Sequence, residues 1–232
     1  MRVITGVLFV AAIGLSQDNL SDLVLSAQRH AARNEHAQAI ADYDRILKLR
    51  PDLAEAYNNR GVEHFKMAHI RQSLADFDKS IELKPAQAPY HWQRGSALYY
   101  AGRSDDGRKQ FELHQTVNGN DVENAAWRYL CMARAGTVQQ ARDAILPIEH
   151  DGRVPMMQIY ALYKGKLGVD EVLTAAGGGR DGLFYAHLYI GLYYEGAGNA
   201  KAAREHIQRA VEQNVNHYMG DVARVHLQLL KR

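Results

Sequence analysis

The chain has 232 residues, of which 47% are hydrophobic, and a formal net charge of +2. This composition is typical of a globular protein and excludes a disordered one. Basic and acidic residues alternate along the chain, which disfavours nucleic acid as a partner because phosphate neutralisation requires a basic stripe.

The first predicted element is a secretory signal peptide over residues 1–16. Arg2 is followed by thirteen uncharged residues, VITGVLFVAAIGL, and then by polar SQDN. Thirteen residues are too few for a bilayer crossing, which needs about 20. We therefore expect a periplasmic or secreted mature protein without a transmembrane span. The region has no cysteine for a lipid anchor. The alternative is a buried N-terminal helix.

Residues 57–85 carry the pattern that organises the rest of the chain. If Gly61 is position eight of a unit, Tyr57 takes position four, Phe77 position twenty-four and Pro85 position thirty-two. These residue types at these offsets are typical of the 34-residue tetratricopeptide repeat (TPR). A glycine suits the closest approach of two paired helices, and a proline cannot extend the second one.

The pattern recurs on both sides of this stretch. Pro51 lies 34 residues before Pro85, and the following unit has Gly95 at position eight and Phe111 at position twenty-four. The sequence therefore predicts an all-α TPR helix-turn-helix solenoid. Its predicted parts are three regular units over 17–121, two degenerate helix pairs over 122–176, a glycine-rich joint at 177–182, a further unit over 183–217 and a capping helix at 218–232.

The order of these parts resembles the NlpI family of bacterial envelope TPR lipoprotein adaptors. The residues that carry the resemblance are Arg60-Gly61-Val62, RGSALYYAGR at 94–103, Ala210-Val211 and NVNH at 214–217. The resemblance implies a periplasmic, dimeric scaffold that holds peptidoglycan hydrolases and delivers one to a processing protease. The family is lipid-anchored, whereas this chain lacks the lipobox cysteine, which puts membrane tethering in doubt.

In a TPR array the first helix of each unit lines a concave groove, so positions five, nine and twelve are the expected ligand contacts. Trp92 and Tyr99 are surplus to the packing positions and indicate a groove that anchors a peptide or partner helix. The alternative is that these aromatic residues belong to the core. The candidate groove residues are Asn58, Val62, Phe65, Trp92, Ser96, Tyr99, Tyr100, Tyr185, Tyr189 and Leu192.

Other kinds of site are disfavoured. Of the residues that would form a carboxylate clamp for a chaperone C-terminus, only Asn59 matches. Cys131, the only cysteine, is expected to be buried, and no histidine or cysteine set has the spacing of a metal site. Two further groups are predicted to be solvated charges: residues 149–151, and the pairs Asp42 with Asp44 and Asp76 with Asp78.

The sequence thus predicts a non-enzymatic scaffold of the bacterial cell envelope that binds other proteins and needs no cofactor. The homodimer is what the resemblance implies, and the alternative is that a cap covers the apolar ends of the array. The alternative is a structural subunit of a secretion or pilus-type assembly, in which the convex face and the terminal helices matter more than the groove. The least favoured hypothesis is an enzyme that uses Cys131 or a histidine cluster.

Overall fold

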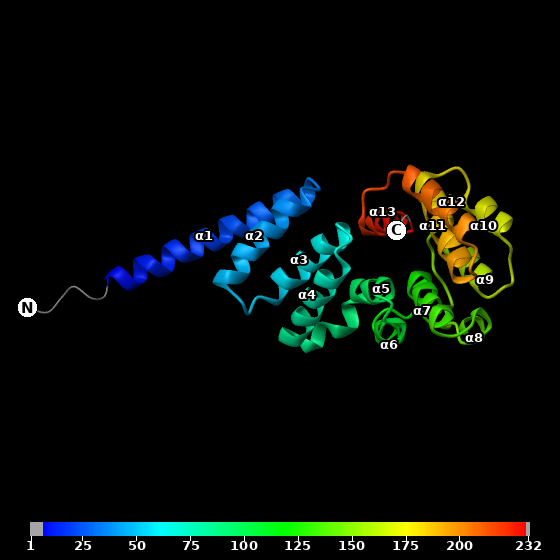
Figure 1. Ribbon diagram of the computed structural model, residues 1–232, viewed down its shortest axis with the longest axis horizontal. Coiled ribbons are helices and arrows are strands. Elements are labelled where there is room, and N and C mark those ends of the chain that lie inside the picture. The colour runs from blue at the N-terminus through cyan, green and yellow to red at the C-terminus, as the bar shows by residue number, and fades with distance from the viewer. Residues whose placement is uncertain (1–6, 231–232) are drawn as a thin grey trace, which may run out of the picture. The chain divides into compact units, whose positions relative to one another are not determined.

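The computed structural model describes residues 7–230, and every regular element in them is helical (Figure 1). The predicted all-α, TPR-like solenoid class is confirmed. The chain divides into two compact units, residues 1–84 and 85–232. The first unit ends before the third predicted repeat begins.

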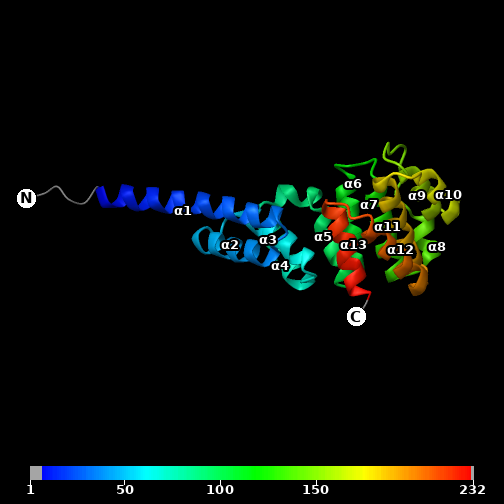
Figure 2. The same ribbon diagram turned by 90° about the horizontal axis from the view of Figure 1, so that it is seen from above.

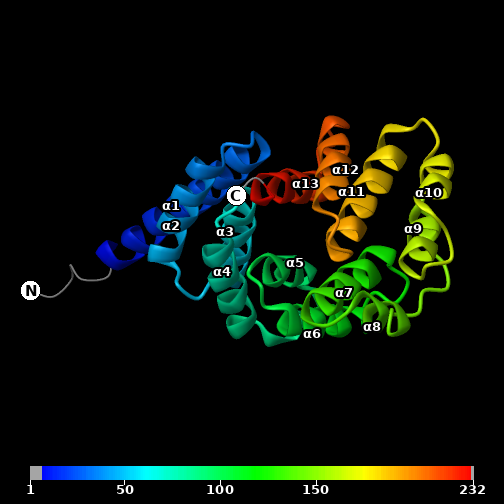
Figure 3. The same ribbon diagram turned by 45° about the vertical axis from the view of Figure 1, so that its right-hand side comes forward.

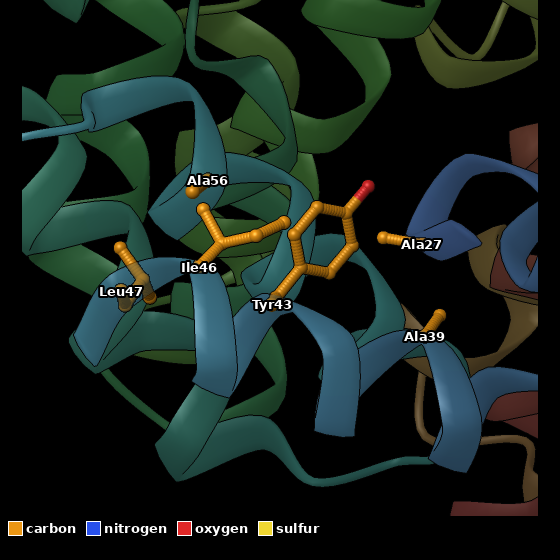
Figure 4. Close-up of a cluster of buried hydrophobic side chains, with 6 residues drawn as sticks. All are labelled: Ala27, Ala39, Tyr43, Ile46, Leu47 and Ala56. Carbon is orange, nitrogen blue, oxygen red and sulfur yellow. The ribbon is translucent and has the colours of Figure 1, made fainter. Parts of the chain in front are cut away.

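The first unit consists of two antiparallel helix pairs, and Figure 2 shows α1 and α2 running side by side. Its helices are α1 (Val7–Ala32), α2 (His36–Leu49), α3 (Ala54–Lys66) and α4 (Ile70–Leu83). The core where α1, α2 and α3 meet is built from Ala27, Ala39, Tyr43, Ile46, Leu47 and Ala56 (Figure 4). Small alanines let the helices approach, and the tyrosine ring and isoleucine fill the space between them.

The second unit begins with a 3₁₀ turn, η1 (Pro85–Tyr90), and continues as short helices (Figure 3). These are α5 (Trp92–Tyr100), α6 (Ser104–Gln115), α7 (Val122–Ala135), α8 (Val138–Asp143), α9 (Met156–Tyr163), α10 (Val169–Ala176), α11 (Arg180–Gly196), α12 (Ala200–Glu212) and α13 (Tyr218–Leu229). The pair α11 and α12 is the most extensively packed, and α13 follows it.

Glycine at repeat position eight lies against a large side chain of the paired helix. A Cβ on Gly61 would come within 3.0 Å of the Phe77 ring, and one on Gly95 within 2.6 Å of the Phe111 ring. The turns inside the first three pairs each contain one residue in the left-handed region, at intervals of 34 residues: Asn34, Ala68 and Gly102. The repeat therefore fixes both the helix contact and the turn.

The predicted domain boundaries stay predictions. The predicted signal peptide lies partly outside the described residues, and from Val7 onwards it belongs to α1. Within residues 7–230, none of the helices combines the length and apolar character that a bilayer crossing requires.

Two of the aspartates predicted to be exposed are buried instead. Asp42 is 6% exposed and accepts a hydrogen bond from Ser26 Oγ at 2.6 Å. Asp76 is 5% exposed and receives two hydrogen bonds, of 2.6 and 2.8 Å, from the Arg60 guanidinium. Both lie where the second helix of a pair meets a first helix, and a buried carboxylate there requires a polar partner. The prediction of exposure was wrong because it took no account of the neighbouring helix, which covers each aspartate and provides its hydrogen-bond donor.

Candidate functional site

The structure divides the predicted groove residues between the two units and into two classes of burial. The buried ones are Phe65, Ser96, Tyr99, Tyr189 and Leu192, and the partly exposed ones are Asn58, Val62, Trp92, Tyr100 and Tyr185. Asn58, Val62 and Phe65 belong to α3 in the first unit, and the other seven belong to the second unit. Only a partly exposed side chain reaches a ligand without rearrangement of the core.

Tyr99 and Tyr100 take part in a polar cluster inside the second unit. The Tyr99 hydroxyl donates to Glu195 Oε2 at 2.9 Å, and the Arg134 guanidinium lies 3.9 Å from the centre of the Tyr99 ring. Arg134 also donates to Glu195 Oε1 at 2.9 Å, while the Tyr100 hydroxyl lies 3.0 Å from Nδ1 of buried His226. These contacts join α5, α7, α11 and α13. The two tyrosines therefore link α5 to three other helices of the second unit.

A pocket of about 220 Å³ opens beside Trp92. Its apolar wall combines Trp92 from α5, Phe111 from α6, Trp127 from α7 and Met219 from α13. Trp127 stacks on Phe111 with ring centres 6.3 Å apart, and Trp92 meets Tyr218 edge to face at 5.0 Å. The polar lining consists of His114, Asn118, Asp121, Glu123 and Asn124. Aromatic surface with a few converging polar groups is the usual chemistry of a binding site.

Carboxylates gather where α7 begins, at the polar side of this pocket. Asp121 caps the helix by accepting the Glu123 N–H at 3.0 Å, and Asp151 accepts the Val122 N–H at 3.2 Å. A helix N-terminus favours such negative charge. Arg153 donates to Asp121 at 2.8 Å and to Asp151 at 2.6 Å, and it is also bonded to Glu123.

Glu123 is the most perturbed of these acids. Burial, followed by the neighbouring Asp121 charge, raises the pKa of Glu123 to about 6, although Arg153 and Tyr189 both bond to it. The Tyr189 hydroxyl donates to Glu123 Oε2 at 2.6 Å. The ionised form of Glu123 is therefore destabilised by its surroundings, and a further cation near the carboxylate would stabilise it.

Tyr185 and Tyr189 lie at this acidic cluster. The ring of Tyr185 is 6.0 Å from the Arg153 guanidinium and stacks on the His217 ring at 5.8 Å. Burial, above all, raises the pKa of Tyr185 to about 12, so its hydroxyl stays protonated at neutral pH. Of the predicted residues, the structure thus brings Trp92, Tyr185 and Tyr189 to one region, linked through Glu123.

Several residues of the pocket were not among the predicted groove residues: Phe111, His114, Asn118, Asp121, Glu123, Asn124, Trp127 and Met219. Phe111 was assigned to packing, which it also performs. The acidic pair at 121 and 123 follows a turn that replaces the closing proline of the third repeat. This departure from the repeat pattern was the feature of the sequence that could have pointed to the acidic residues of the pocket. Nothing local in the sequence places Met219 against α5.

The residues considered for catalysis, Cys131 and Asp151, are both buried. Cys131 is fully buried, as expected, and burial raises the pKa of its thiol to about 12, which disfavours the nucleophilic thiolate at neutral pH. Asp151 was expected in a solvated turn but is 8% exposed, because it caps α7 and pairs with Arg153. Among the side chains that the structure describes, residues 20–230, no group of three or more histidine, cysteine or acidic residues is arranged so that it could hold a metal ion.

Comparison with known proteins places the fold in a class of helical-repeat proteins. Residues 27–67 match a TPR repeat model and residues 54–87 match a tetratricopeptide repeat model. The chain therefore carries tetratricopeptide repeats over residues 27–87, and its fold is that of TPR proteins.

Solved TPR structures are similar in fold over most of the chain. MamA from Desulfovibrio magneticus RS-1, from residue 41 to its end, has a TM-score of 0.55 at 13% identity, covering 85% of this chain and 96% of that one. A tetratricopeptide repeat protein from Parabacteroides merdae has a TM-score of 0.57 at 12% identity, with coverage of 92% and 85%. YrrB, described as a TPR protein with an unusual peptide-binding site, has a TM-score of 0.52 at 18% identity, with coverage of 93% and 97%.

Proposed function

We propose that the second unit captures a segment of a partner protein in the pocket beside Trp92, so that the chain works as a non-enzymatic scaffold. The pocket itself carries this proposal: an aromatic wall from three helices next to a set of carboxylates. TPR proteins are protein-binding scaffolds, and YrrB is described as having a peptide-binding site. Trp92 is the partly exposed aromatic side chain of the wall, and such residues are frequent binding hot spots.

The test compares two neighbouring aromatic residues. Trp92→Ala removes part of the pocket wall, whereas Tyr90→Ala removes a side chain that is 56% exposed and does not line the pocket. We expect the first variant to bind a partner captured by the wild-type chain about tenfold more weakly. The second should bind it with unchanged affinity. Calorimetry with the captured partner measures both affinities. Equal affinity of Trp92→Ala and wild type would exclude the pocket as the binding site.

We further propose that this scaffold works in the bacterial cell envelope, with a peptidoglycan hydrolase or a processing protease as partner. The support is the signal-peptide pattern over residues 1–16 together with the resemblance to the NlpI family. Fractionation of cells that express the full chain tests the location. Recovery in the cytoplasm, with residues 1–16 still attached, would contradict it.

A homodimer is part of the same proposal. Leu25 in α1 is 53% exposed, and a repeat array needs its apolar ends covered by a cap or by a partner. Light scattering of the purified chain distinguishes a dimer from a monomer by mass. A monomer at micromolar concentration would contradict the homodimer, but it would not contradict the proposal that the pocket binds a partner.

A further inference from the structure

The acidic side of the pocket has more negative charge than its own residues neutralise. Three carboxylates, Asp121, Glu123 and Asp151, surround one guanidinium, that of Arg153. If all are ionised, the cluster holds two uncompensated negative charges. The described lining of the pocket contains neither lysine nor arginine. A positively charged ligand group is therefore the electrostatic complement of the site.

Two residues of the lining also have a buried polar atom that lacks a hydrogen-bond partner within the described residues. Asn124 is 3% exposed, and its Nδ2 donates to Phe111 O and Gln115 Oε1, but its Oδ1 has no hydrogen-bond partner within the described residues. Trp127 is 2% exposed, and its Nε1 is likewise unpartnered there. Both residues line the pocket, so one acceptor and one donor close to it lack a partner. A peptide that brings N–H donors on a side chain and a backbone carbonyl would satisfy both.

The size and walls of the pocket narrow the class of ligand. About 220 Å³ is less than the roughly 300–1,000 Å³ of sites that hold drug-sized molecules. It suits a single large side chain. The partly exposed ring of Trp92 favours a flat cation, because a guanidinium stacks on such a ring and presents five donors to neighbouring oxygens.

We propose that this pocket receives an arginine side chain of the partner segment, with the guanidinium between the aromatic wall and the carboxylates of Asp121 and Glu123. The assignment rests on the proposed function and names the anchor residue of the partner. A lysine fits the charge but not the flat shape, and a neutral side chain does not fit the charge.

The chain provides its own reporters for a test. It has only two tryptophans, Trp92 and Trp127, and both line the pocket. We would titrate the full chain with N-acetyl-arginine amide and follow the two indole N–H signals by NMR. The matched probes are the amides of N-acetyl-citrulline, which is neutral and similar in shape, and N-acetyl-lysine.

We expect both indole signals to shift in a saturable way with the arginine probe, and the citrulline probe to bind about tenfold more weakly. Glu123→Gln should weaken the arginine probe several-fold, whereas Glu149→Gln, which removes an exposed carboxylate outside the lining, should not. Helicity by circular dichroism checks that each variant is folded. If Glu123→Gln does not fold, the comparison of probes on the wild-type chain decides alone.

Equal binding of the arginine and citrulline probes, equal binding of arginine and lysine, or no saturable shift at millimolar concentration would each overturn the arginine assignment. These results are distinguishable from failure of the proposed function. If Trp92→Ala loses the protein partner while the arginine probe does not bind, the scaffold function stands and the anchor is another residue. If the probe binds but Trp92→Ala keeps the partner, the partner binds elsewhere.

Discussion

At the scale of single residues, Gly95 shows how closely the helices of a pair approach. An added Cβ would lie 2.6 Å from the Phe111 ring, which is 1% exposed and stacks on Trp127. The added methyl group would therefore push the ring away from its stacked position on Trp127. We expect Gly95→Ala to lower the free energy of unfolding by about 1–3 kcal/mol, as overpacking of a core does. Urea denaturation measures the loss.

A second glycine supplies the control for this measurement. In Gly119→Ala the nearest atom to the new Cβ would be Gln115 O, at an ordinary contact distance of 3.8 Å. Its stability should stay within about 0.5 kcal/mol of the wild type. If the two variants lost the same stability, the contact with Phe111 would not be the cause.

At the scale of elements, α11 and α12 are joined by a histidine pair, with Nδ1 of His187 3.0 Å from Nδ1 of His206. Burial, and then the neighbouring His206, lowers the pKa of His187 from 6.5 to about 4. Between these values the unfolded chain binds more protons than the folded one, so stability falls as the pH drops from about 6.5 towards 4. We expect a loss of about 1–3 kcal/mol between pH 7 and pH 5.

Urea midpoints at the two pH values measure this loss. His187→Gln should reduce the difference between them, because the substituted side chain does not titrate. His150→Gln, at an exposed position, should leave the difference unchanged. An unaltered pH dependence in His187→Gln would mean that other groups cause the acid destabilisation.

At the scale of the whole molecule, the pocket and all the hydrogen bonds described for its lining lie within the compact unit 85–232. We therefore expect a fragment of residues 85–232 to be helical, to unfold cooperatively and to bind the arginine probe within about twofold of the full-chain affinity. Circular dichroism and the indole titration test this. A fragment without a cooperative transition would show that residues 1–84 are needed for its folding.

The repeat contacts could be predicted from the sequence because they are periodic. Gly61 and Gly95 meet the rings at position twenty-four of their own units, and Trp92 lies at a position that lines the pocket. The remaining features depend on distant pairings that have no local pattern. Tyr99 bonds to Glu195, 96 residues away. Arg153 reaches back 32 residues to Asp121, which turns a capping residue into part of an acidic site.

The position of both tryptophans in one pocket has a spectroscopic consequence for the study of folding. Indole fluorescence reports only on the second unit, whereas far-ultraviolet ellipticity reports on the helices of both. If the units unfold as one, emission and ellipticity give superimposable denaturation curves. Two separated curves would yield the stability of each unit from one unmodified sample, without an attached dye.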